Sequence, residues 1–187
     1  MDRSELTGTI LAGGKSSRMG REKGLVEFRG KQLISYGIDM LSMYTDRILI
    51  SSGNPDYQTF GLEMVPDGVT GQGPAAGLAA ALKKSKTTWN LIIACDLPFL
   101  ELVLIDSLLE NSGINQIVIP VHGDVQEPLA GLYHQTCAED FESAVSSRNL
   151  ALHKILLTMK VHYLDVSLLV EKYPRMFINL NTPEDLD

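Results

Sequence analysis

Hydrophobic positions along this chain alternate between short apolar runs and longer stripes at helical spacing. The runs predict strands at residues 8–12, 47–51, 62–65, 90–95, 116–120, 127–133, 162–164 and 176–178, and a shorter extended piece at residues 25–28 that a turn at Arg29 and Gly30 closes. The stripes predict helices at residues 32–43, 74–84, 101–110, 136–147 and 149–159, and a last helix that begins at Thr182. Strands that alternate with helices are typical of a mostly parallel sheet with helices on both faces.

This alternation predicts the α/β class, as a three-layer α/β/α Rossmann-like fold with a mostly parallel sheet. Strands 116–120 and 127–133 are close neighbours in sequence, and we expect them to add an antiparallel element. With 187 residues, no shift of composition and no internal repeat, the chain is expected to form a single domain over residues 1–187.

Composition narrows the class of protein. A hydrophobic content of 44% is ordinary for a globular protein, and a net charge of -7 argues against a nucleic-acid-binding surface. Cys95 and Cys137 have no C-x-x-C spacing, so they suit a reducing compartment rather than a zinc site. The first residues lack the apolar segment of a signal peptide, and no apolar run reaches the length of a membrane span. We therefore expect a cytoplasmic protein with no nucleic-acid or membrane partner.

The segment 11–23, which follows the first predicted strand, carries the most chemical information. Three glycines, two serines and four cationic side chains gather in it, against the acidic balance of the whole chain. Glycines let backbone N–H groups approach an anion closely. Arg18 and Lys23 add full positive charge, as a planar fork and a point charge that both suit phosphate. We interpret this segment as a cradle for a triphosphate.

Two common phosphate motifs do not fit the chain. Residues 14–16 look like the end of a P-loop, but that motif needs a glycine at position 9, where the chain has Thr. Residues 71–76 match the dinucleotide pattern G-x-G-x-x-A, but they follow a polar turn and contain Pro74, which lacks a backbone donor. A turn that opens a helix explains this second segment better than dinucleotide binding does.

Two acidic residues follow predicted strands at the sheet edge where ligands bind in open α/β folds. Asp96 comes directly after the apolar run 91–95, where one carboxylate can hold Mg²⁺ together with substrate phosphates. The same residue can instead cap the next helix or turn the chain with Pro98. Asp67 lies in an ordinary turn tripeptide and draws interest because it faces the same edge.

The C-terminal segment (residues 177–185) combines a helix start with two asparagines. Thr182 as the cap and Asp185 as the reciprocal acid come near a capping box. A capping box does not explain Asn179 and Asn181, which are spaced to face the same way on a strand and to reach a ligand. The four histidines show no ligand spacing, and we expect none of them to act as a metal ligand or a general base.

Five motifs, in order along the chain, resemble those of the molybdenum cofactor guanylyltransferase family. They are residues 11–23, 73–78, 95–99, 127–133 and 177–185, and the resemblance covers nearly the whole chain. It implies the nucleotide-diphospho-sugar transferase-like fold and a Mg²⁺-dependent nucleotidyltransferase. It also implies site roles: the guanine nucleotide is held by Leu11, Ala12, Gly13, Lys23 and Asp67, Mg²⁺ is held by Asp96, and the molybdopterin side lies toward Asn179 and Asn181.

Gly14 bears on the choice of base. Relatives that transfer cytidylyl or uridylyl groups usually resemble L-A-A-G at this point, whereas residues 11–14 of this chain are L-A-G-G, which favours guanine. Some family members carry a nucleotide-contacting Asn where this chain has Ser51, so the resemblance does not extend to that contact.

The expected reaction is in-line attack by the phosphate of the molybdopterin cofactor on the α-phosphorus of GTP, with release of pyrophosphate. Arg18, Lys23 and Asp96 are the expected catalytic residues, because this chemistry depends on positioning and charge neutralisation. The substrates would be GTP and a molybdopterin-type cofactor, with transient contact to proteins that deliver or accept that cofactor.

Two other hypotheses stay open at this point. The acceptor and base can differ, as in cytidylyl transfer to molybdopterin or nucleotidyl transfer to a sugar or polyol phosphate. The chain can also be a non-catalytic nucleotide-binding protein, although the presence of both Lys23 and Asp96 argues against that hypothesis.

Overall fold

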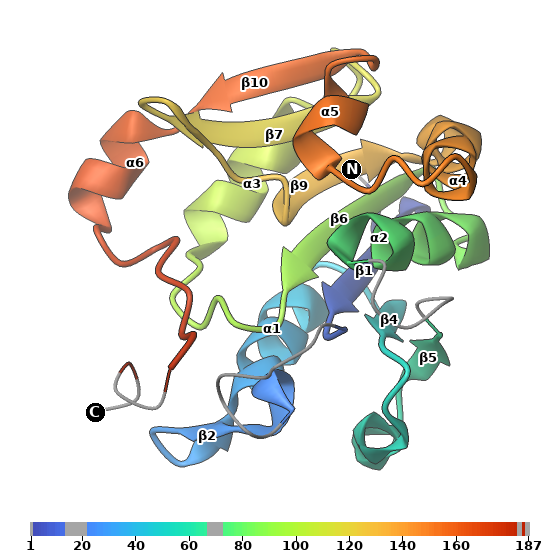
Figure 1. Cartoon of the computed structure of the whole chain (residues 1–187). Coiled ribbons are helices and arrows are strands. Elements are labelled where there is room, and N and C mark those ends of the chain that lie inside the picture. The colour runs from blue at the N-terminus through green and yellow to red at the C-terminus, as the bar shows by residue number, and fades with distance from the viewer. Residues whose placement is uncertain (1, 14–21, 67–72, 183–184, 186–187) are drawn as a thin grey trace.

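The computed structural model describes residues 2–13, 22–66, 73–182 and 185. At the centre of this part of the chain is an eight-stranded sheet in the order β10-β7-β9-β6-β1-β4-β5, with β8 paired to β7 (Figure 1). The strands are β1 (Leu6–Leu11), β4 (Ile48–Ser51), β5 (Glu63–Val65), β6 (Trp89–Ala94), β7 (Ile117–His122), β8 (Val125–Gln126), β9 (Ala130–His134) and β10 (Val161–Asp165).

Strand directions match the predicted class. β1 pairs in parallel with β4 and β6, β4 with β5, and β7 with β10. β9 runs antiparallel to both β6 and β7, and the short β8 runs antiparallel to β7. The prediction of a mostly parallel sheet with an antiparallel element is confirmed. Because β1, β4 and β6 are parallel, the residues that follow them emerge at one edge of the sheet.

Helices cover both faces of the sheet and complete three layers (Figure 1). The α-helices are α1 (Leu33–Ser42), α2 (Gly73–Lys84), α3 (Leu102–Glu110), α4 (Ala138–Ser146), α5 (Leu152–Leu156) and α6 (Ser167–Lys172), and the 3₁₀ helices are η1 (Arg3–Glu5), η2 (Lys23–Leu25), η3 (Pro55–Phe60) and η4 (Gln135–Cys137). α1 and α3 pack on one face, and α2, α4 and α5 pack on the other. In the described ranges, no helix is both long and apolar enough to cross a lipid bilayer.

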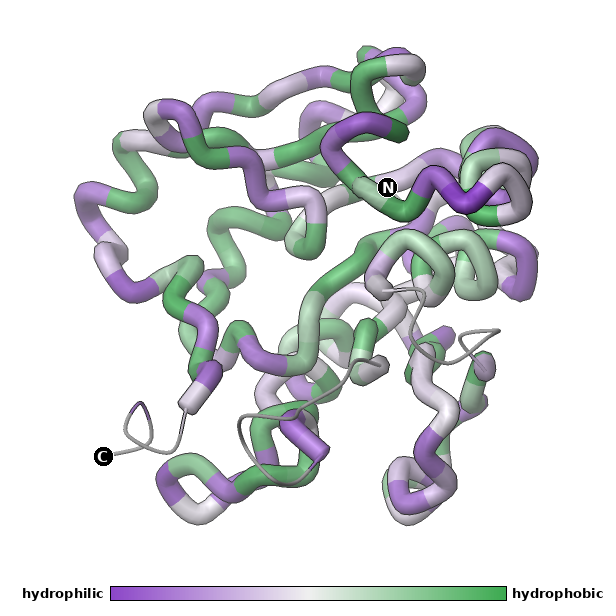
Figure 2. Tube along the Cα trace, in the orientation of Figure 1, coloured by the Kyte–Doolittle hydropathy of each residue, from purple (hydrophilic) through white to green (hydrophobic). Residues whose placement is uncertain are grey.

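Burial on both faces explains why the central strands are continuous apolar runs rather than alternating patterns. Every residue of β1 is buried. Ile10 joins the core cluster under α1 and α3, while its neighbour Leu11 joins the cluster under α2 and α4. Ile93 and Ile92 of β6 divide in the same way, and Figure 2 shows the hydrophobic colour along this strand.

A small hairpin beside the sheet confirms a predicted turn. β2 (Glu27–Phe28) and β3 (Lys31–Gln32) pair in antiparallel fashion. The two residues between them, Arg29 and Gly30, have φ values of 51° and 77°, as a tight hairpin turn requires.

A third apolar cluster ties the C-terminal segment to this hairpin. Leu180 is 1% exposed and packs with Phe28 and Leu33. Phe99 flanks the cluster and meets the ring of Phe28 edge-on, with centroids 5.6 Å apart. A buried leucine therefore holds the end of the described chain against the body of the protein.

Residues 176–178, predicted as a strand, form a turn instead. The N–H of Met176 donates to the carbonyl of Tyr173, and the N–H of Ile178 donates to that of Arg175, each at 3.0 Å. These backbone groups are used locally and are not available to a sheet neighbour. The apolar residues that suggested a strand serve the core, since Met176 is 1% exposed.

Two further differences lie in the second half of the chain. The predicted helix at 149–159 shortens to α5, because Arg148 adopts a left-handed φ of 58° and Ala151 is extended. The sequence pattern also does not predict α6. The helix predicted to begin at Thr182 lies mostly outside the described residues. Other predicted strands and helices in the described ranges appear within a few residues of their expected positions.

Replacing Leu180 by Ala should destabilise the protein, because the change opens a cavity in the third cluster. We expect the free energy of unfolding in urea to fall by about 2–5 kcal/mol. Ile178→Ala is the matched control, since Ile178 lies on the same segment but is 44% exposed. Equal losses of stability in the two variants would contradict this account of the C-terminal segment.

Candidate functional site

Three segments that are far apart in sequence meet at the edge of the sheet where β1 and β6 end. Lys23 opens η2, Asp96 follows β6 by two residues, and Asn181 lies near the C-terminus. The ammonium of Lys23 donates to the carboxylate of Asp96 and to the amide oxygen of Asn181. The structure thus brings together three residues that the sequence placed in one site, and we call Lys23, Asp96 and Asn181 the edge cluster.

The charged pair of the edge cluster is largely shielded from water. Lys23 exposes 18% of its side chain and Asp96 exposes 14%. Opposite charges in such a setting attract more strongly than on an open surface, and each offsets the cost of burying the other. An anion can replace Asp96 at Lys23, and a cation can replace Lys23 at Asp96. The pair therefore suits a ligand that brings an anion and a cation together.

Backbone hydrogen bonds fix the position of Asp96 from two directions. The N–H of Cys95 donates to the carbonyl of Leu11 at 3.1 Å, so the pairing of β1 with β6 extends to the residue before Asp96. The carbonyl of Asp96 accepts from the N–H of Leu180 at 3.2 Å. The carboxylate therefore projects from a backbone that is held on both sides.

The two asparagines of the C-terminal segment make different contacts. The side-chain oxygen of Asn181 accepts from the ammonium of Lys23, and the side-chain N–H of Asn181 donates to the backbone carbonyl of Asn179 at 3.4 Å. The carboxylate of Asp185 accepts from the N–H groups of Asn181 and Thr182, each at 2.8 Å, which confirms the predicted reciprocal acid. The expectation that both asparagines face the same way on a strand is wrong, because this segment uses turn and capping contacts in place of sheet pairing.

The end of β1 lies beside the edge cluster. Leu11 and Ala12 are buried, and the N–H of Ala12 donates to the carbonyl of Ser51 at 2.9 Å. Their side chains belong to the core, so a ligand here would meet backbone groups. Gly13 is exposed, and the chain becomes accessible at this residue.

Three further residues that the sequence assigned to the site, Gly14, Arg18 and Asp67, lie outside the described residues. The described elements on either side of the first two are β1 and η2, which both reach the edge cluster. Asp67 follows β5, the strand that pairs in parallel with β4. Their roles remain predictions.

Tyr57 supports the backbone around Lys23, and the sequence analysis did not single it out. Its side chain is fully buried, and its hydroxyl donates to the carboxylate of Glu22 at 3.4 Å. A Cβ atom on Gly24 would come within 2.7 Å of this hydroxyl, so the glycine allows the close approach. Burial raises the pKa of Tyr57 far above its usual range, which keeps the hydroxyl a donor. The only hint in the sequence is an aromatic residue within the connection between two predicted strands.

Cys95, next to Asp96, does not have the properties of a nucleophile. Its side chain is buried, and burial together with the nearby Asp96 raises the pKa of the thiol to about 12, although Lys23 acts in the opposite direction. At neutral pH the thiol therefore stays protonated and behaves as a small apolar group.

The edge cluster offers oxygen ligands to a hard cation. These are the carboxylate of Asp96 and the amide oxygen of Asn181. Among the described residues there is no group of three or more His, Cys, Asp or Glu side chains arranged to hold a metal. Mg²⁺ needs only one or two carboxylates when phosphates and waters complete its shell. The donor set fits Mg²⁺ that arrives together with a phosphate ligand.

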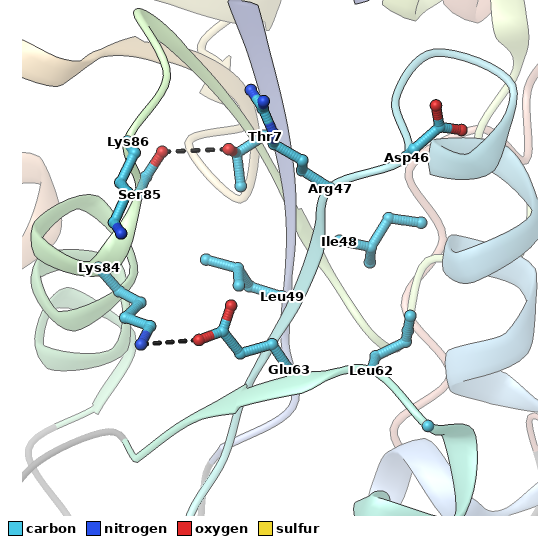
Figure 3. Close-up of a pocket in the computed structure, with 11 residues that line it drawn as sticks. Thr7, Asp46, Arg47, Ile48, Leu49, Leu62, Glu63, Lys84, Ser85 and Lys86 are labelled. Carbon is cyan, nitrogen blue, oxygen red and sulfur yellow. Dashed lines mark hydrogen bonds and ion pairs between the residues drawn. The ribbon is translucent and has the colours of Figure 1, made fainter. Parts of the chain in front are cut away.

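A polar pocket at the opposite edge of the sheet does not share these features. It has a volume of about 520 Å³ and lies where β4 and β5 begin and α2 ends (Figure 3). Lys84 forms an ion pair with Glu63 at 2.7 Å, and Arg47 donates to the carbonyl of Ser4. Lys84 and Arg47 are thus already engaged with the protein, and none of the predicted site residues lines the pocket.

The chain is similar in sequence to a group of known proteins. A family model described as the MobA-like NTP transferase domain matches residues 8–161. A probable molybdenum cofactor guanylyltransferase from Halalkalibacterium halodurans is 31% identical, with 100% of this chain and 98% of the relative covered. A molybdenum cofactor guanylyltransferase from Vibrio parahaemolyticus is 33% identical, with 95% of this chain and 91% of the relative covered.

Solved structures show the same overall fold. Molybdopterin-guanine dinucleotide biosynthesis protein A from Archaeoglobus fulgidus superposes with a TM-score of 0.81 at 28% identity, over 96% of this chain and 94% of the other. CMP:2-keto-3-deoxy-manno-octonic acid synthetase, solved with CTP, shares only the fold, with a TM-score of 0.73 at 12% identity over 96% and 94% of the two chains. The predicted nucleotide-diphospho-sugar transferase-like fold is confirmed. This chain belongs to the MobA-like NTP transferase family and is a nucleotidyltransferase with molybdenum cofactor guanylyltransferases among its relatives.

Proposed function

We propose that this nucleotidyltransferase moves GMP from GTP to the phosphate of a molybdopterin-type cofactor and releases pyrophosphate. The names of its relatives support these two substrates. The observation that carries the proposal is the ammonium of Lys23 between Asp96 and Asn181, where β1 and β6 end. A cation and a carboxylate held together match a substrate composed of a triphosphate and Mg²⁺.

The donor nucleotide is proposed to lie along the end of β1. Leu11, Ala12 and Gly13 offer backbone groups to the guanine nucleotide, in keeping with the burial of the first two side chains. Gly14, the fourth residue of the same segment, favours guanine over cytosine. Asp67 is proposed to bind the nucleotide from the loop that follows β5.

The reaction then needs no covalent intermediate with the protein. An oxygen of the acceptor phosphate attacks the α-phosphorus of GTP, and the bond from that phosphorus to the bridging oxygen breaks, so that pyrophosphate leaves. Lys23 and Arg18 stabilise the charge that develops on the leaving group. When bound at Asp96, Mg²⁺ supplies further neutralisation of the phosphate charge.

The acceptor is proposed to lie on the side of Asn179 and Asn181. Asn181 contacts Lys23, so it stands between the donor and acceptor sides of the edge cluster. We also propose that the reaction takes place in the cytoplasm, in keeping with two buried free cysteines. A protein that delivers or accepts the cofactor would then dock only transiently.

The activity itself is tested by pyrophosphate release. Purified protein with Mg²⁺, GTP and molybdopterin is expected to release pyrophosphate faster than with CTP in place of GTP, by about tenfold or more. A preference for CTP would overturn the choice of base, and faster turnover with a sugar phosphate would overturn the choice of acceptor. GTP binding with no pyrophosphate release in the presence of molybdopterin would indicate a non-catalytic protein.

Asp96→Asn keeps the size of the side chain but removes the charge that faces Lys23 and Mg²⁺. We expect kcat to fall by about 10²-fold or more, with partial recovery at higher Mg²⁺ concentration. Asp106→Asn is the matched control, because Asp106 lies on the exposed side of α3 and accepts from the hydroxyl of Tyr44 at 2.8 Å. Turnover of Asp96→Asn close to that of the control would show that Asp96 is not the metal site.

A further inference from the structure

A second polar cluster stands at the same edge of the sheet as the edge cluster. His122 is the last residue of β7, and its Nε2 lies 3.1 Å from Oε1 of Glu127. The two side chains are 23% and 19% exposed. They are therefore shielded like the edge cluster, yet still reachable from solvent. The mechanism proposed above does not use either residue.

Phe177 links this pair to the C-terminal segment. Its ring stacks on the imidazole of His122, with centroids 5.1 Å apart and an angle of 2° between the planes. Asn181 of the edge cluster comes only four residues later on the same segment. One short stretch of chain therefore runs from the His122–Glu127 pair to Lys23.

Strand order places the pair on the acceptor side of Asp96. The N–H of Ala94 donates to the carbonyl of Leu129 at 2.8 Å, so the residues just before β9 lie beside the end of β6. The N–H of Glu127 donates to the carbonyl of Pro120 at 2.9 Å. Because the order is β7-β9-β6-β1, the His122–Glu127 pair lies beyond Asp96 from the end of β1, where the nucleotide is proposed to bind.

The chemistry of the pair favours a flat ligand with adjacent N–H donors. One oxygen of Glu127 faces His122, and within the described residues no N–H or O–H group donates to its second oxygen. Burial raises the pKa of the Glu127 carboxyl, and the hydrogen bond to His122 acts against that rise. A half-buried carboxylate is stabilised by charge-assisted hydrogen bonds from N–H donors. The planar rings of His122 and Phe177 beside it suit a planar ligand.

Pterin and guanine both present such donors, because each carries a 2-amino-4-oxopyrimidine ring with a ring N–H beside an exocyclic amine. We propose that Glu127, with His122 and Phe177 beside it, binds this edge of the pterin ring of the acceptor. The proposal rests on the proposed function for the identity of the acceptor. Strand order favours the pterin over the guanine of GTP as the ligand of this subsite.

Direct binding tests the subsite without catalysis. The probes are 6-hydroxymethylpterin and 6-hydroxymethyllumazine, which has an oxygen in place of the 2-amino group, with ligand fluorescence as the readout. The wild-type protein is expected to bind the pterin about tenfold more tightly, and Glu127→Gln is expected to abolish this preference. Glu142→Gln is the matched control, because Glu142 on α4 forms an exposed ion pair with Lys83 of α2. Equal binding of the two probes by the wild-type protein would overturn the proposal.

Steady-state kinetics separate the two possible sources of the ring. Glu127→Gln is expected to raise KM for molybdopterin about tenfold while KM for GTP and the preference for GTP over ITP stay unchanged. A rise in KM for GTP, or loss of the preference over ITP, would assign Glu127 to guanine and overturn the pterin assignment. If the wild-type protein does not transfer GMP, the proposed function fails, and the fluorescence experiment still decides the pterin subsite.

Discussion

The ammonium of Lys23, shared between the carboxylate of Asp96 and the amide oxygen of Asn181, is the contact on which the rest of the site depends. It joins the loop after β1, the end of β6 and the C-terminal segment. Both charges are mostly shielded, so either one left alone would carry a cost in solvation free energy. In the proposed function, a triphosphate with Mg²⁺ would offer each charge a new partner, so that the contact present without ligand would prepare the site for one.

The sheet makes this contact possible and gives the site its two sides. Parallel pairing of β1 with β6 brings Leu11 and Asp96 to one edge, and Leu180 brings the C-terminal segment to the same place. On the other side of β6, the antiparallel β9 returns the chain so that Glu127 also comes to this edge. The donor is proposed to occupy the side of β1 and the acceptor the side of β9 and β7.

Much of this arrangement could be predicted from the sequence, because its strongest signals are local. The buried runs at residues 8–12 and 90–95, and the residues that follow them, identified β1, β6 and Asp96. The run at 176–178 misled because Met176 and Phe177 look like strand residues while their backbone groups make turns. Asn181 was found for the wrong reason, since it reaches the site from a capped turn and not from a strand.

Long-range contacts left no local signal. The support that Tyr57 gives to Gly24 depends on the packing of η3, which follows β4, against η2 near the start of the chain, and no spacing in the sequence predicts that contact. Glu127 was visible only as part of a strand motif, and its pairing with His122 depends on the β7–β8 hairpin.

Crystals grown with GTP and Mn²⁺ in place of Mg²⁺ test the central claim most directly, since anomalous scattering locates the metal independently of any assumed site. We expect a metal peak at the carboxylate of Asp96, with the triphosphate beside Lys23 and the guanine along the end of β1. A metal and triphosphate bound elsewhere, such as in the polar pocket lined by Arg47 and Lys84 at the opposite edge of the sheet, would contradict it.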